Sequence, residues 1–172
     1  AKITPVQCPL EILLNFDLTS VSPLQALKAA AVSAFPDRGR VGELELNGTI
    51  AQAWMAIARV LAVEPAELAR AIAPIYGVEP ATGLDAPEPI ALAAMPSAFC
   101  QQRNILPLRI SEGRLVVATS NPMDENLSER ARFIAARSIT WVLAPPQAIE
   151  DAVVMAYARE AIRQAKPDKP ES

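Results

Sequence analysis

The sequence predicts an α+β fold, in which an N-terminal helical subdomain is followed by a small three-stranded mixed sheet with helices packed on it. Apolar residues in the first half recur every three or four positions, which is the spacing of helices that bury one face. The second half alternates short apolar runs with turn residues, a pattern typical of short strands. Aromatic residues make up only 5% of the chain, so we expect cores built from Ala, Leu, Ile and Val.

The expected helical subdomain spans residues 1–78. Ser22 precedes a proline, and this pair favours a helix start because Ser caps the first turn and Pro fits into it. Residues 40–50 are ambiguous between helix and strand. Helical spacing is clearer over residues 50–63 and again over residues 64–77, where a glycine ends the pattern.

Residues 79–89 are rich in proline, and we expect a linker or surface loop there. The second subdomain is expected over residues 90–165 in the order αββαβα, with a polar tail at residues 166–172. Its predicted elements are a helix at 96–104, strands at 105–110, 115–119 and 138–143, a helix starting at Asp124 or Asn126, and a helix at 147–164.

The connections predict the sheet topology. A tight turn at Ser111-Glu112-Gly113 makes the first two strands antiparallel. A helix joins the second strand to the third and is long enough for a right-handed parallel crossover. The sheet is therefore expected to be mixed. No residue at the ends of its strands is suited to catalysis, so we expect the sheet to serve as a scaffold.

Composition and missing motifs exclude several classes of function. The formal net charge of −3 argues against nucleic-acid binding, and no apolar run approaches the about 20 residues needed to span a bilayer. Histidine is absent, which removes the commonest general base and the usual transition-metal ligand. No phosphate-binding glycine loop is present. We therefore expect no enzyme, no cofactor and no metal site.

The cysteines and the paired acids support this expectation. Cys8 and Cys100 are far apart and lack the CxxC spacing of a zinc site. Two free thiols in a reducing cytoplasm are favoured, although a disulfide between them stays open. The acid pairs at 43/45 and 124/125 are interpreted as solvated or helix-capping carboxylates.

Trp54 and Met55 are candidates for a protein interface, because Trp is enriched among the residues that dominate binding energy. Trp54 also lies on the apolar stripe of its helix, and this spacing favours a core position. The two interpretations differ in the exposure that they predict for the indole ring.

Short motifs in the second half resemble a known family. A helix that starts at proline runs into a Leu-Pro-Leu strand, and a Leu-Val-Val-Ala strand leads into the turn Asn-Pro-Met-Asp. Together these motifs resemble the N-terminal domain of the ATPases of type II secretion and type IV pilus assembly, over residues 57–157. Asn121 replaces the usual Asp, and either side chain can form an Asx turn. The structural motif residues are Pro96, Leu106, Pro107, Gly113, Asn121, Pro122 and Asp124.

The resemblance implies a cytoplasmic adaptor domain, peripheral at the inner membrane. Such a domain docks on the cytoplasmic part of an inner-membrane platform protein and recruits an attached motor to it. The attached domain is an ATPase in these systems and a glycosyltransferase in some relatives. The chain begins without Met and ends in a polar tail, which is expected of a fragment of a larger protein and equally of a processed chain.

Some members of the family instead bind cyclic di-GMP through two helical motifs that begin Arg-Leu-Gly. Arg40-Val41-Gly42 echoes one such motif, with Arg40 facing phosphate and Gly42 allowing close backbone approach. The spacing to Gly48 is one residue short, and a second copy is absent at Cys8 and at Gln52. Nucleotide binding is therefore the alternative to docking.

Overall fold

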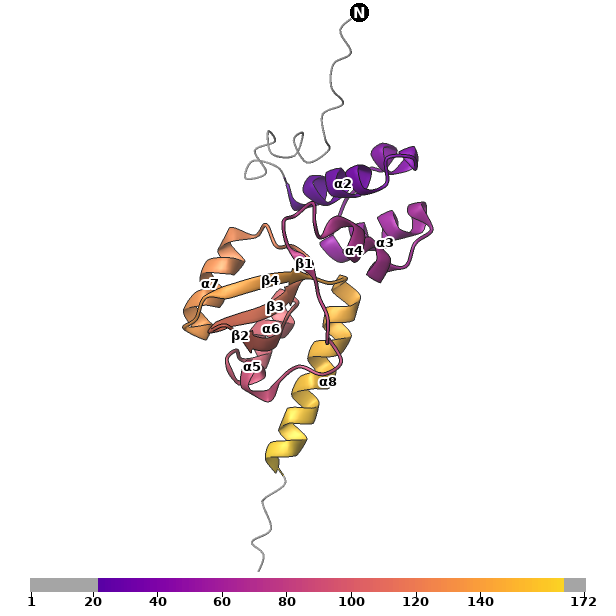
Figure 1. Ribbon diagram of the computed structural model, residues 1–172. Coiled ribbons are helices and arrows are strands. Elements are labelled where there is room, and N and C mark those ends of the chain that lie inside the picture. Colours follow the sequence, from indigo (N-terminus) through magenta and orange to yellow (C-terminus); the bar gives the residue numbers. More distant parts are fainter. Residues whose placement is uncertain (1–21, 166–172) are drawn as a thin grey trace, which may run out of the picture. The chain divides into compact units, whose positions relative to one another are not determined.

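The structure is a computed structural model that describes residues 22–165 of the 172-residue chain (Figure 1). Its contacts divide the chain into two compact units, Ala1–Glu79 and Pro80–Ser172. We call the first the helical unit and the second the sheet unit, and we describe each by itself.

Local capping fixes where the helices of the helical unit begin. The Ser22 side chain accepts a hydrogen bond from the Gln25 amide at 3.3 Å, which caps the first helix as predicted. Thr49 and Gln52 form a reciprocal capping box at the start of the third element. The elements are α2 (Pro23–Ala34), the 3₁₀ helix η1 (Gly39–Glu43), α3 (Ile50–Leu61) and α4 (Pro65–Ile72).

The segment that was ambiguous from the sequence therefore contains a single short 3₁₀ helix, followed by non-regular backbone. Helix α2 packs against both α3 and α4. The apolar stripes of the three helices meet in one small core, as the helical spacing predicts. Its largest buried side chains are Leu27, Trp54, Ile57, Leu61, Leu68 and Ile72.

The sheet unit holds the strands, in the spatial order β1-β4-β3-β2. Strand β3 lies in the centre of the core, since all its residues except the first are buried. The elements are β1 (Glu79–Pro80), α5 (Pro89–Ala93), α6 (Ser97–Arg103), β2 (Ile105–Ser111), β3 (Arg114–Thr119), α7 (Glu125–Ala135), β4 (Ile139–Leu143) and α8 (Pro146–Ala165).

The predicted strand pairing is confirmed. Strands β2 and β3 are antiparallel, and the turn between them uses positive φ at Glu112 (51°) and Gly113 (75°). Strands β3 and β4 are parallel, with Leu115 opposite Ile139, and α7 forms the crossover between them.

The α+β class is confirmed, whereas the expectation of three strands is wrong, because β1 adds a fourth. Strand β1 consists of only two residues, one of them proline, and so has no alternating pattern that would indicate a strand. Their pairing depends on a distant partner, since the Ala81 amide donates to the Leu143 carbonyl at 2.8 Å. Residues 79–89 were expected as a linker or surface loop, and residues 81–88 form no helix or strand. Helix α5 was not predicted.

The same segment protects the outer strand of the sheet. The Glu88 amide donates to the Leu108 carbonyl at 2.8 Å, beside an irregularity in the pairing of β2 between Pro107 and Arg109. Pro107 also lacks an amide proton. An unprotected edge strand would present a row of free amides and carbonyls to other chains. The Glu88 hydrogen bond, the irregular pairing and Pro107 each make it harder for another chain to pair with β2.

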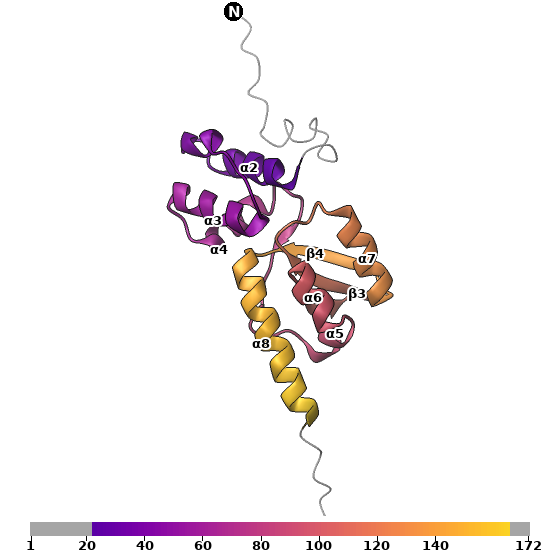
Figure 2. The same cartoon turned by 180° about the vertical axis from the view of Figure 1, so that it is seen from behind.

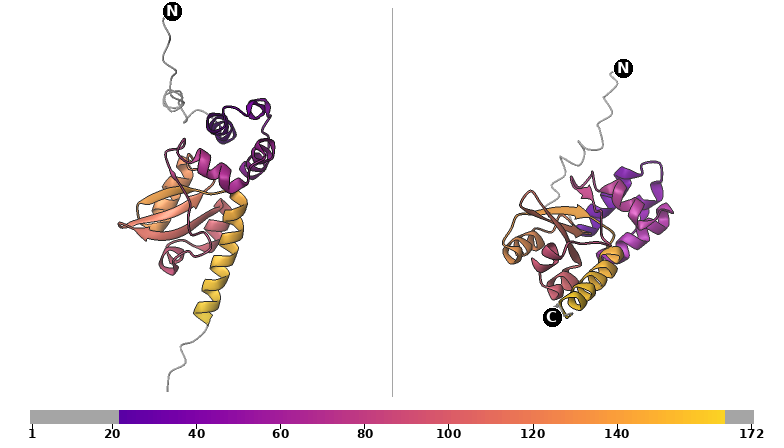
Figure 3. Two further views of the ribbon diagram at one scale, coloured as in Figure 1. Left: turned by 45° about the vertical axis from the view of Figure 1, so that its right-hand side comes forward. Right: turned by 60° about the horizontal axis from the view of Figure 1, so that its bottom comes forward.

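Helices α5, α6 and α8 contact β2, and α8 also contacts β3, whereas α7 contacts β4. Figure 2 shows α6 and α8 in front of the strands. The last turns of α8 continue past the sheet, as the left view of Figure 3 shows, and all residues from Ala161 to Ala165 are exposed.

Candidate docking surfaces

The turn between β3 and α7 holds the motif residues that the sequence singled out. The Asn121 side chain accepts a hydrogen bond from the Met123 amide at 3.4 Å, which is an Asx turn. Asp124 is the N-cap residue of α7, and its carboxylate accepts from the Leu127 amide at 3.0 Å. These side chains shape the backbone and fix the start of α7.

The other motif residues also have structural positions. Pro96 is the N-cap residue of α6. Leu106 is fully buried in β2, Pro107 lies beside the irregularity of that strand, and Gly113 lies in the hairpin turn. The motif residues therefore stabilise the helix starts, the turns and strand β2 of the sheet unit.

Helix α7 carries the most exposed large apolar side chain among residues 22–165. Leu127, Ala131 and Ala135 face the sheet at a spacing of four residues. Phe133 falls on the opposite side of this helix, and 88% of its surface is exposed. It lines a shallow depression of about 230 Å³ together with Glu129, Arg130 and Ile134. We call these four residues the Phe133 surface.

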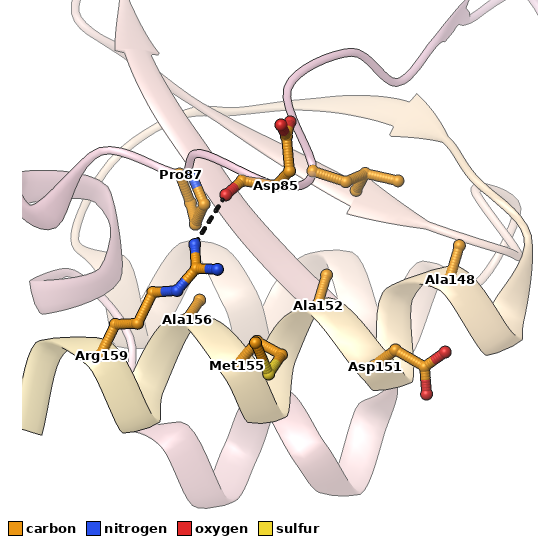
Figure 4. Close-up of a pocket in the computed structure, with 9 residues that line it drawn as sticks. Asp85, Pro87, Ala148, Asp151, Ala152, Met155, Ala156 and Arg159 are labelled. Carbon is orange, nitrogen blue, oxygen red and sulfur yellow. Dashed lines mark hydrogen bonds between the residues drawn. The ribbon is translucent and has the colours of Figure 1, made fainter.

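A second apolar depression runs along α8 (Figure 4). It has a volume of about 330 Å³ and lies between α8 and the loop that precedes α5. Met155 lies in the middle, with Asp151 and Arg159 on either side of it. The Arg159 guanidinium donates to the Asp85 carbonyl at 3.1 Å. We call it the α8 groove, and its lining residues are Leu84, Asp85, Pro87, Ala148, Asp151, Ala152, Met155, Ala156 and Arg159.

In the helical unit, the structure separates the two candidate interface residues. Trp54 is 1% exposed and lies in the core, whereas Met55 is 50% exposed. Met55 lines a depression at the end of α3 that also includes Arg59 and Glu64. The burial of Trp54 leaves Met55 as the accessible member of the pair.

Arg40 and Gly42 both lie in η1 and are exposed. A side chain at Gly42 would meet no atom within 4 Å, so packing does not require glycine there. The two residues are thus accessible to a ligand.

Cys100 is a buried free thiol in α6, and Cys8 lies outside the described residues. Within residues 22–165, no group of His, Cys, Asp and Glu side chains is arranged to hold a metal ion. In the same range, no helix has both the length and the apolar character needed to cross a membrane.

Sequence reasoning missed both the Phe133 surface and the α8 groove. The regular series Leu127, Ala131 and Ala135 would have identified the buried side and left Phe133 opposite to it. No sequence signal indicates the groove, because the loop before α5 forms one of its walls.

The sheet unit is thus a small mixed α+β domain whose accessible features are shallow apolar surfaces on its outer helices. Residues 75–163 match the family model of the MshEN domain, and the chain belongs to that family. This confirms the resemblance to the N-terminal domains of type II secretion and type IV pilus assembly ATPases. A comparison with curated protein sequences gave no match.

Solved structures share the fold at low sequence identity. The N-terminal domain of XpsE is 17% identical with a TM-score of 0.52, and the match covers 74% of this chain and 94% of that one. A structure of MshE with cdg is 14% identical with a TM-score of 0.52, covering 78% of this chain and 98% of that one.

Proposed function

We propose that this chain is a non-catalytic adaptor domain that docks an attached motor domain to an inner-membrane platform protein. Membership of the MshEN family supports the proposal, because the family includes N-terminal domains of secretion and pilus ATPases. The domain would act in the cytoplasm, at the inner membrane through its partner, and the motor would be an ATPase outside this chain.

The observation that carries the proposal is the exposure of Phe133. An aromatic side chain that is 88% exposed on a capped helix gains apolar burial when a partner covers it. Arg130 lies beside it, and aromatic residues and Arg are the types most often found at the centre of interfaces. The Asp124 cap and the packing of Leu127 on the sheet hold α7 in place, so little ordering cost accompanies binding.

The test is the affinity of the chain for the cytoplasmic part of the platform protein of the same system, measured by calorimetry. We expect Phe133→Ser to weaken binding by at least about tenfold, because an apolar anchor at an interface centre is lost. The free energy of unfolding should stay within about 0.5 kcal/mol of wild type, because the side chain contributes little to the core.

Ile90→Ser is the matched control, since Ile90 is 60% exposed on another helix of the sheet unit. Met55→Ser tests the surface that the sequence suggested on the helical unit. Unchanged affinity in Phe133→Ser, or equal losses in Phe133→Ser and Ile90→Ser, would refute docking through the Phe133 surface.

Binding of cyclic di-GMP is the second candidate function. It is favoured by the fold shared with the structure of MshE with cdg and by the exposed pair Arg40 and Gly42 in η1. Arg40 would pair with a phosphate, and Gly42 would let the backbone approach the ligand.

Calorimetry with cyclic di-GMP tests this candidate. Saturable heat that disappears in Arg40→Ala and persists in Arg38→Ala would establish nucleotide binding at η1. The absence of heat from the wild-type chain would rule it out.

A further inference from the structure

The α8 groove has an arrangement of charge and apolar surface that is complementary to itself. Asp151 lies four residues before Met155, and Arg159 lies four residues after it, on the same side of α8 (Figure 4). Opposite charges therefore flank one apolar side chain at equal spacing. A rotation by 180° about an axis that passes through Met155 and is perpendicular to the helix exchanges the positions of the two charges.

These two charges do not neutralise each other within the chain. Eight residues of helix separate them by about 12 Å, well beyond an ion pair. Neither Asp151 nor Arg159 forms an ion pair with another residue in the range 22–165. The ion pair on α8 in that range joins Arg163 to Glu160.

Each charged group is nevertheless held in position. The Asp151 carboxylate accepts from the Gln147 side chain at 3.1 Å, and the Arg159 guanidinium donates to the Asp85 carbonyl at 3.1 Å. Both contacts leave the charge in place and leave further oxygen and N–H positions free for a partner.

The apolar residues of the groove fit the same symmetry. Ala148 and Ala152 leave space on one side of Met155, and the groove there is lined mostly by apolar atoms. On the other side, the exposed Ile162 lies seven residues from Met155, as Ala148 does in the opposite direction. Ile162 of one helix would thus lie over Ala148 of an antiparallel helix.

We propose that the α8 groove binds a second copy of this chain, with the two α8 helices antiparallel about a two-fold axis at Met155. Asp151 of each copy then faces Arg159 of the other, and two ion pairs flank a central Met155 contact. A parallel arrangement would place like charges together, so the charges select the antiparallel one. The inference concerns a different helix from the Phe133 surface and stands apart from platform docking.

The test is the oligomeric state of the full chain, measured by sedimentation over a wide range of protein concentration. We expect a reversible dimer that weakens at high salt, because its ion pairs are exposed. Met155→Glu should give a monomer, since it places two like charges at the axis. Met55→Glu is the matched control, because Met55 is 50% exposed and Met155 is 53% exposed.

A charge swap makes the test specific to this geometry. Asp151→Arg and Arg159→Asp should each weaken the dimer by about tenfold or more, since each leaves two pairs of like charges in contact. The double variant Asp151→Arg/Arg159→Asp should dimerise again, because each new Arg meets a new Asp. Thermal melts would verify that every variant is folded.

Three results would overturn the proposal. The wild-type chain could be monomeric at every concentration, or the double variant could stay as weak as the single ones. The third result is loss of platform binding in Met155→Glu with normal binding in Phe133→Ser, which would assign the groove to the platform protein instead.

Discussion

Tyr157 and Cys100 form a partly buried polar cluster that links α8 to α6. The Tyr157 hydroxyl lies 3.3 Å from the Cys100 Sγ and donates toward the carbonyls of Met95 (3.0 Å) and Leu92 (3.3 Å). Burial raises the pKa of the Cys100 thiol from its ordinary value of 9.0 to about 11. Burial also raises the pKa of Tyr157, and the neighbouring thiol adds to this effect. Both groups are therefore neutral in the folded protein at physiological pH.

This cluster predicts a loss of stability at alkaline pH. A raised pKa in the folded state stabilises the fold fully below the unfolded value, and the contribution is lost as pH rises through the folded value. For Cys100 the decline runs from about pH 9 to about pH 11, and a shift of this size corresponds to about 2–3 kcal/mol. Urea unfolding across that range measures it. The decline should be shallower in Cys100→Ala, and an equal decline in both proteins would contradict the assignment.

Single residues were predictable from the sequence where their role is local. Ser22 caps its helix, and Asn121 makes its Asx turn with backbone only two residues away. The choice between core and interface for Trp54 required the packing of three helices, and its burial now favours the core. Whether a residue is accessible depends on the whole unit, which is why Phe133 was missed.

Among the elements, α7 depends on its cap. Asp124→Ala should lower the free energy of unfolding by about 1 kcal/mol, because the Leu127 amide loses its acceptor and the helix N-terminus loses a negative charge. Chemical denaturation measures this change. Asn121→Asp is the matched variant and should be nearly neutral, since Asp makes the same turn. No loss in Asp124→Ala would show that the cap is not needed to hold α7.

The elements predicted correctly are those with a strong local signal. The β2–β3 hairpin has its turn residues, and α8 has apolar residues at helical spacing. Strand β1 has no such signal, because a partner more than sixty residues away along the chain determines its pairing. Helix α5 is only a single short segment, and its length explains why periodicity did not indicate it.

At the scale of the whole molecule, we expect the sheet unit to fold by itself. Its core is contiguous over β2–β4 and α5–α8, and its apolar residues pack within residues 80–165. A chain of residues 79–165 should unfold cooperatively and show native-like dispersion of its amide resonances. A fragment that lacks cooperative unfolding would mean that the sheet unit depends on the helical unit.

Docking through α7 is the central claim, and amide chemical-shift mapping tests it most directly. The isotopically labelled chain would be titrated with the unlabelled cytoplasmic part of the platform protein. We predict saturable shifts centred on residues 129–134 of α7, with the helical unit unchanged. Shifts confined to η1 and α3, shifts confined to α8, or no shifts at saturating partner would each contradict docking through the Phe133 surface.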